Sequence, residues 1–354
     1  MSGQELALLR LAAQRLVGPP LPGAAEAVRH LTAVQAQDFP GALLSVALRS
    51  APRTRGAVAA ALDAGEVVRS WPMRGTLHLV AAEDLLWMTR LLTPRVLSAT
   101  AGRRRGLDLA EADVERGREL AVQALTGGGR LRRAELFALW EAAGIATAGQ
   151  RGVHLVQVLA MTGTVVLGPT CGNGSEQHYV LCDEWIRSSR DLEGDEALAE
   201  LALRYFRGHG PATVADLARW AQLPVTQARA GARLARPALE ARTVDGTEYL
   251  LDPRTPEVLE AARARAIGVL LLPGFDEFVL GYGDRSAQLD PVHADRIVPG
   301  GNGVFRPTVV SAGRVVGTWT RRVRGTASRF EASAFTAFAP DVEAALPGLA
   351  AELP

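Results

Sequence analysis

A repeated order of elements restricts the fold of this chain more than any other feature of its sequence. The stretch 108–126 places apolar residues at helical spacing, carries acidic residues in its first turn and stops at three glycines, which together predict a helix. Two further helices and a Gly-rich hairpin are predicted at 132–144, 147–163 and 164–182. Three helices followed by a hairpin are typical of the winged-helix fold.

The same order recurs after this stretch and, more loosely, before it. Downstream, the pattern predicts a capping box at Thr213 and Asp216 and a two-residue turn at Asp245-Gly246. The downstream helices are expected at 195–207, 213–223 and 225–235, with a hairpin at 239–252. The upstream helices are expected at 3–16, 24–36, 41–50 and 55–64, with strands at 66–72 and 74–80.

Beyond residue 255 the helical repeat gives way to alternating, β-branched stretches at 268–282 and 304–325, followed by a helical segment at 338–353. Such stretches predict a small β-barrel or sandwich closed by a helix. We therefore predict an α+β protein built from three tandem winged-helix units at 1–102, 103–190 and 191–255 and a C-terminal β-barrel at 256–354.

The basic residues narrow the chemistry that the chain can perform. Its 354 residues carry a formal net charge of +1, and the 39 basic residues are all arginine. Without lysine, catalysis through a lysine Schiff base is excluded. Because the total charge is near neutral, binding to nucleic acid requires local arginine clusters. Such clusters occur at 103–105, 130–133 and 321–324, where plain solvation of the side chains is an equally good interpretation.

Nothing in the sequence indicates a cofactor or a metal. It contains no phosphate-binding loop, HExxH motif or paired Cys-x-x-Cys motif, and its six histidines are scattered. Cys171 and Cys182 are expected to be small buried side chains. No apolar run reaches the roughly 18 to 20 residues of a membrane span, and the first helix lacks the features of a signal peptide. We expect a cytoplasmic protein without membrane contact.

The segment Val34-Gln35-Ala36-Gln37-Asp38-Phe39-Pro40 concentrates polar groups ahead of a proline. Residues two apart on a helix point to nearly opposite faces, so Gln35 and Gln37 share a face only where the chain leaves the helix. Pro40 is expected to cause this, because proline disfavours helical backbone at the residue before it. A polar helix end and a reaction site both fit the residues alone.

Four stretches identify a family resemblance. They are VQAQDFPGALLSVALR at 34–49, VVRSWPMRGTLHLVAAEDL at 67–85, LLPGFDEFVLGYGDR at 271–285 and FRPTVVSAGRVVGTW at 305–319. In this order, over nearly the whole chain, they resemble the AlkZ/YcaQ family of bacterial DNA glycosylases. That resemblance implies three winged helices and a β-barrel around a C-shaped, DNA-binding channel.

The resemblance also implies the site and the reaction. The family signature is glutamine, an apolar residue, then glutamine or aspartate, so Gln35 and Gln37 match the AlkZ-like branch and are the implied catalytic residues. The implied reaction is hydrolysis of the N-glycosidic bond of N7-alkylated guanine, including unhooking of interstrand crosslinks, as in self-resistance to azinomycin-like genotoxic natural products. Two amides can hold a water without carrying charge, and Asp38 is expected to orient one of them. Without lysine, we expect a glycosylase that has no lyase activity.

Five residues are the expected DNA contacts. Arg74, Thr76 and His78 alternate and so share one strand face, and Arg322 and Arg324 follow on the predicted barrel hairpin. Packing or solvation explains them equally well. The expected partner is double-stranded DNA carrying an N7-alkylguanine or a crosslink, bound near the nucleoid by a monomer.

Two other functions are open on the residues alone. A winged-helix transcriptional regulator without chemistry would bind a defined operator and would not depend on Gln35 or Gln37. A protein-interaction scaffold would show DNA binding with weak salt dependence.

Overall fold

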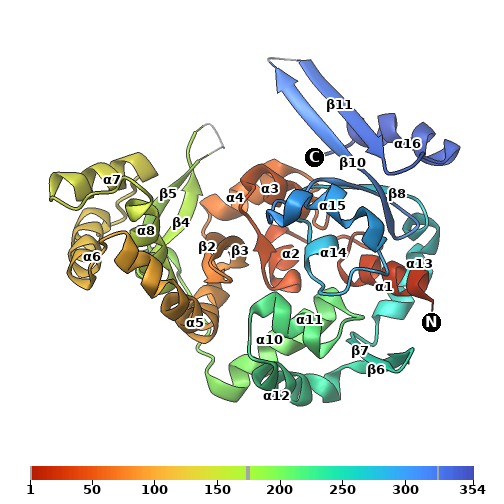
Figure 1. The fold of residues 1–354 in the computed structure, drawn as a ribbon, viewed down its shortest axis with the longest axis horizontal. Coiled ribbons are helices and arrows are strands. Elements are labelled where there is room, and N and C mark those ends of the chain that lie inside the picture. The colour runs from red at the N-terminus through yellow and green to blue at the C-terminus, as the bar shows by residue number, and fades with distance from the viewer. Residues whose placement is uncertain (1, 173–175, 325–326) are drawn as a thin grey trace. The chain divides into compact units, whose positions relative to one another are not determined.

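The computed structural model describes residues 2–172, 176–324 and 327–354 (Figure 1). It divides into two compact units, of which unit 1 comprises Met1–Arg55 and Ala199–Pro354 and unit 2 comprises Gly56–Leu198. Unit 2 is therefore an insertion in the sequence of unit 1. None of the helices in the described ranges is long and apolar enough to cross a bilayer.

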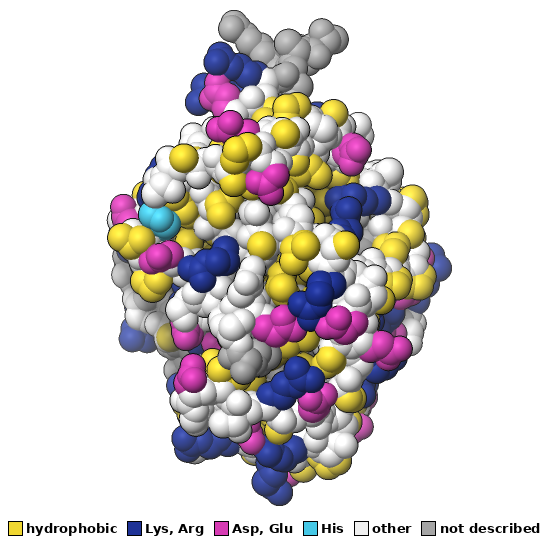
Figure 2. Space-filling view, turned by 90° about the vertical axis from the view of Figure 1, so that its right-hand side faces the viewer, with side chains coloured by type: hydrophobic (Ala, Val, Ile, Leu, Met, Phe, Trp, Pro, Cys, Tyr) yellow, Lys and Arg dark blue, Asp and Glu magenta, His cyan; other side chains and the backbone are white. Residues whose placement is uncertain are grey.

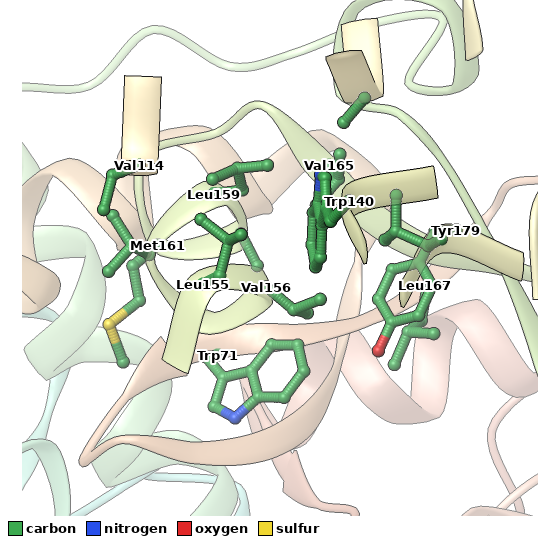
Figure 3. Packing of buried hydrophobic residues seen from close by; sticks show 14 of the residues in the cluster. Trp71, Val114, Trp140, Leu155, Val156, Leu159, Met161, Val165, Leu167 and Tyr179 are labelled. Atoms are coloured by element: carbon green, nitrogen blue, oxygen red, sulfur yellow. The ribbon is translucent and has the colours of Figure 1, made fainter. Parts of the chain in front are cut away.

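Unit 2 packs helices against an antiparallel sheet in the order β3-β2-β4-β5. Its strands are β2 (Val67–Met73), β3 (Thr76–Ala81), β4 (Val165–Thr170) and β5 (Gln177–Leu181). Its helices are α4 (Arg55–Asp63), α5 (Leu85–Gly106), α6 (Glu111–Leu125), α7 (Arg133–Ala142), α8 (Arg151–Met161) and α9 (Cys182–Trp185). Figure 3 shows the core between them, where Trp140 is fully buried and donates its indole N–H to the Gly117 carbonyl.

The order of elements predicted for 108–182 is confirmed by α6, α7, α8 and the β4-β5 hairpin. The long helix α5 was not predicted. Pro94 lies inside it, and its last turn is the arginine run 103–105, so the sequence lacks a continuous apolar stripe there. Cys182 is buried and Cys171 is partly exposed, and both are free thiols.

The helical part of unit 1 draws on both ends of the chain. It contains α1 (Gly3–Ala13), α2 (Ala24–Leu31), the short strand β1 (Val34–Gln35), α3 (Phe39–Ala47), α10 (Gly194–His209), α11 (Val214–Ala221), α12 (Val225–Ala235) and α13 (Thr255–Ala266), with the hairpin β6 (Glu240–Val244) and β7 (Thr247–Leu251). The predicted capping box is present, since Thr213 Oγ1 accepts from Asp216 N at 3.0 Å. The predicted turn is present too, with positive φ at Asp245 and Gly246.

The C-terminal sheet is antiparallel in the order β11-β10-β9-β8. Its strands are β8 (Val269–Leu272), β9 (Thr308–Ser311), β10 (Arg314–Arg324) and β11 (Ala327–Ala334), and α16 (Pro340–Ala351) follows. In the described part of the chain this sheet is open, which corrects the predicted closed barrel. The region after β8 supplies short helices instead of strands, α14 (Glu277–Leu280) and α15 (Ala294–Ile297). Asp276 explains the first, because its carboxylate caps the Phe278 N–H.

This sheet holds α3 in place. Leu44 of α3 packs with Leu271, Val309 and Trp319 in one buried cluster. Trp319 also donates its indole N–H to the Leu272 carbonyl at 2.9 Å. Helix α3 is therefore packed against β8, β9 and β10.

Candidate active site

The glutamine motif lies between two helices of unit 1. Helix α2 ends at Leu31, and Thr32 follows with a left-handed φ of 69°. The helix predicted to run to residue 36 thus stops earlier, and Gln35 lies on β1. Pro40 does not end a helix: it lies in the first turn of α3, with Asp38 as the N-cap. Proline suits that turn because its missing N–H has no helical partner there.

The structure confirms that the chain has left the helix at the motif, but it places the two glutamines differently. Gln35 is buried, with 8% of its surface exposed, whereas Gln37 is exposed. Neither of them lines the groove that opens beside Asp38. The motif therefore presents one amide from inside unit 1 and one at its surface.

The groove beside Asp38 has a volume of about 470 Å³. Its walls come from the start of α3, from the loop after β8 and from β10. Asp38 folds back over Gly41, where a methyl group on the glycine Cα would lie only 2.5 Å from Asp38 Oδ2. The absence of a side chain at Gly41 therefore lets the carboxylate lie over the helix N-terminus, where negative charge is favoured.

Two arginines line the same groove. Burial lowers the pKa of Arg55, and the nearby positive charge of Arg321 lowers it further. The negative charge of Asp38 partly opposes both effects. The Arg55 Nε atom is buried and has no hydrogen-bond partner in the described residues. The lining of the groove thus contains two cations and one carboxylate.

Neither groove arginine was predicted from the sequence. The arginine run 321–324 was noticed, but the residues selected were Arg322 and Arg324. Successive side chains on a strand point to opposite faces, so Arg321 and Arg322 differ in what they face. Alternation within the run could have separated them, whereas the nearness of Arg55 is visible only in the fold. Arg322 is exposed, and the side chain of Arg324 lies outside the described part of the structure.

A strained loop borders the groove. Gly274 lies in its wall, and the next residue, Phe275, has a left-handed φ of 59°, which is rare for a bulky side chain. Asp276 follows and is anchored to α3, since it accepts a hydrogen bond from Ser45 Oγ at 2.7 Å and two from Arg49 at 2.8 Å. These bonds hold the loop in its strained conformation.

Unit 2 brings Arg74, Thr76 and His78 together. Arg74 lies in the turn before β3, and its Nη2 donates to His78 Nε2 at 2.8 Å, so His78 Nδ1–H donates to the Thr76 carbonyl at 2.9 Å. Burial, and then the Arg74 charge, hold the pKa of His78 well below its usual value. His78 is fully buried, so we expect it to affect DNA binding by positioning Arg74 rather than by direct contact.

Charge is mixed on the part of the surface drawn in Figure 2, where arginines are interleaved with aspartates and glutamates. In the described ranges, no group of three histidine, cysteine, aspartate or glutamate side chains is arranged to hold a metal ion.

Comparisons with known proteins agree with the resemblance in the sequence. The family model described as DNA glycosylase AlkZ-like matches residues 28–353. An interstrand DNA cross-link repair glycosylase of Streptomyces sahachiroi is 29% identical over 316 residues, which cover 84% of this chain and 82% of that protein. The solved structure of Streptomyces sahachiroi DNA glycosylase AlkZ has a TM-score of 0.80 at 26% identity, covering 100% of this chain and 96% of that one.

Proposed function

The chain belongs to the AlkZ-like DNA glycosylase family, and from that premise we propose that it hydrolyses the N-glycosidic bond of N7-alkylated guanine in DNA. Its substrates include guanines tied into interstrand crosslinks, which it unhooks. The observation that carries this proposal is the Gln35-Ala36-Gln37 signature at the extended junction between α2 and α3. The similarity to a cross-link repair glycosylase supports the choice of substrate.

The proposed chemistry needs little acid catalysis. A guanine alkylated at N7 is already cationic, so it leaves as a neutral base when the bond to C1′ breaks. Gln35 and Gln37 hold the attacking water through their amide oxygens and N–H groups. The new bond joins the water oxygen to C1′, and the water's proton passes to solvent. Asp38 orients the neighbouring amide, and its charge favours the cationic sugar that develops.

The groove beside Asp38 is the proposed binding site for the DNA backbone. Arg55 and Arg321 offer planar donor groups that suit a phosphate. Arg74, acting with Thr76 and His78, and the hairpin arginines Arg322 and Arg324 are further proposed contacts. The three winged-helix units, with the boundaries 102, 190 and 255 predicted above, are the proposed framework for binding duplex DNA.

The proposed role is repair of damage from DNA-alkylating natural products, including self-resistance in a producer. We propose that a monomer performs it and that the strand stays intact, because the chain has no lysine to form a Schiff base with the abasic sugar.

A base-release assay tests the function. Duplexes carrying N7-methylguanine or a defined N7 crosslink are incubated with the wild type, Gln35→Ala and Gln37→Ala, and released base is measured. Gln123→Ala, an exposed glutamine on α6, is the matched control. We expect release by the wild type and the control and a loss of at least about a hundredfold in either motif variant. DNA binding without release by the wild type would instead support the regulator.

A further inference from the structure

A second pocket lies within unit 2 and shares no residue with the groove beside Asp38. It has a volume of about 230 Å³ and is walled by the aromatic residues Trp71, Phe137 and Tyr179. A cavity of about 150 Å³ already holds a benzene ring. The pocket therefore has room for a flat heterocycle.

Two polar side-chain atoms at this pocket make no hydrogen bond to the protein in the described ranges. Trp71 is 8% exposed and Tyr179 is 5% exposed. Figure 3 shows Trp71 beside Val156 and Tyr179 beside Leu167, and both of these apolar residues also line the pocket. Across the described residues, neither the Trp71 indole N–H nor the Tyr179 hydroxyl makes a hydrogen bond. Burial raises the pKa of Tyr179 to about 12, so its hydroxyl keeps its proton. Both side chains are largely buried, and their donor groups are available to a ligand that enters the pocket.

Charged groups complete the lining. Arg133 is exposed, and its guanidinium carbon lies 5.2 Å from the Phe137 ring centre. Arg69 donates to Gln177 Oε1 at 3.3 Å. Glu176 adds a carboxylate. Aromatic walls, two donors, one acceptor and two cations match the parts of a nucleotide, which are a flat base, carbonyl and amino groups on its edge, and a phosphate.

We propose that this pocket binds a single unstacked nucleotide, with its base between Trp71, Phe137 and Tyr179 and its phosphate on Arg133 and Arg69. The Trp71 N–H donates to a base carbonyl, and Glu176 accepts from an exocyclic amino group. Guanine and cytosine carry both groups, whereas adenine lacks the carbonyl and thymine lacks the amino group. The pocket therefore selects guanine or cytosine nucleotides.

The nucleotide has two sources, a free mononucleotide or one displaced from a DNA strand. The binding probes are guanosine and adenosine 5′-monophosphate, guanosine without phosphate, and a duplex with one bulged guanine beside a fully paired duplex. Affinities of the full-length chain are measured by calorimetry for the small ligands and by fluorescence anisotropy for the duplexes. These assays do not require base release, so they remain informative if the proposed glycosylase function fails.

Three variants and one control test the assignment. Trp71→Phe and Tyr179→Phe keep the rings and delete the donors, and Arg133→Ala removes an exposed cation without disturbing the core. Trp185→Phe is the matched control, because it likewise deletes an indole N–H that has no partner in the described residues, but Trp185 lies outside the pocket. We expect each donor variant to weaken binding about tenfold. Arg133→Ala should weaken the binding of guanosine monophosphate and leave the affinity for guanosine unchanged.

The outcomes separate the sources. If guanosine monophosphate binds more tightly than adenosine monophosphate with this variant pattern, the site takes free nucleotides. If only the bulged duplex shows the pattern, the site takes a nucleotide from the strand. If neither affinity depends on Trp71, Tyr179 and Arg133, in variants that keep their circular dichroism and melting temperature, the proposal is wrong.

Discussion

Arg49 and Asp276 form a bidentate ion pair inside unit 1, with Nη1 to Oδ2 and Nη2 to Oδ1 both at 2.8 Å and both side chains no more than 1% exposed. Burial by itself raises the pKa of Asp276, but the Arg49 charge and its hydrogen bonds outweigh burial and hold the pKa below its ordinary value. The pair joins the end of α3 to the loop that walls the groove beside Asp38.

Breaking this pair should be costly, because the partner is left buried and charged. Asp276→Asn is expected to lower the free energy of unfolding by about 3 to 5 kcal/mol, measured by urea denaturation. Arg236→Met breaks the exposed pair with Glu248 and should cause a far smaller loss, because surface ion pairs contribute little to stability. Equal losses of unfolding free energy in the two variants would show that the buried pair does not anchor the loop.

Gly41→Ala should separate stability from activity. Alanine favours a helix by about 1 kcal/mol over glycine, and the clash is with a movable carboxylate, so the melting temperature should hold or rise. Base release should fall, since Asp38 is pushed off the helix N-terminus. Comparing Asp38→Ala with the double variant Gly41→Ala/Asp38→Ala supplies the check. If adding Gly41→Ala lowers activity further once Asp38 is gone, displacement of Asp38 is not the cause.

Arg55→Ala and Arg321→Ala should weaken DNA binding in a salt-dependent way. Each phosphate contact that is lost reduces the slope of log affinity against log salt by about 0.9. Arg314→Ala removes the same charge from an exposed position on β10 outside the groove, so it should keep the wild-type slope. The slopes are measured by anisotropy titrations. Identical slopes for the wild type and all three variants would exclude the groove as a phosphate-binding site.

The product of the reaction should be an intact strand carrying an abasic site. Borohydride traps a Schiff base between an amine and the abasic sugar, and here only the chain's terminal amine could form one. We expect no trapped adduct, and strand breaks only after heat or alkali, on denaturing gels beside a lysine-dependent bifunctional glycosylase. A nick formed without heat or alkali would contradict this prediction.

Stability should fall as the solution is acidified below about pH 6.5. The pKa of His30 is lowered to about 4, and the pKa of His78 is lowered well below its usual value. Burial is the main cause in both cases. Between pH 6.5 and 4 the unfolded chain therefore binds protons that the folded chain does not, which favours unfolding. Each histidine contributes at most about 1.4 kcal/mol per pH unit. His30→Gln should flatten the profile of unfolding free energy over this window, and an unchanged slope would refute the assignment.

Local patterns predicted the helices and hairpins well where residues close together in sequence determine the cap or the turn. Examples are the capping box of Thr213 and Asp216 and the turn at Asp245 and Gly246. They failed where the same residue is compatible with two different local structures. Pro40 can follow a helix or begin one, and the left-handed Thr32, which ends α2 early, has no sequence signature. The groove was out of reach because Asp38, Arg55, Gly274 and Arg321 meet only through tertiary packing.

The insertion of unit 2 into unit 1 has a consequence for synthesis. Arg49 and Asp276 are 227 positions apart, so a ribosome releases the whole of unit 2 before the partner of Arg49 exists. Contacts this distant in sequence form late, because a long loop must close first. Unit 2 has its own continuous stretch of chain and core, and can complete its folding while the N-terminal helices of unit 1 still await their partners. Until then Arg49 remains solvated, and the loop that walls the groove takes its strained form only when the last third of the chain has been made.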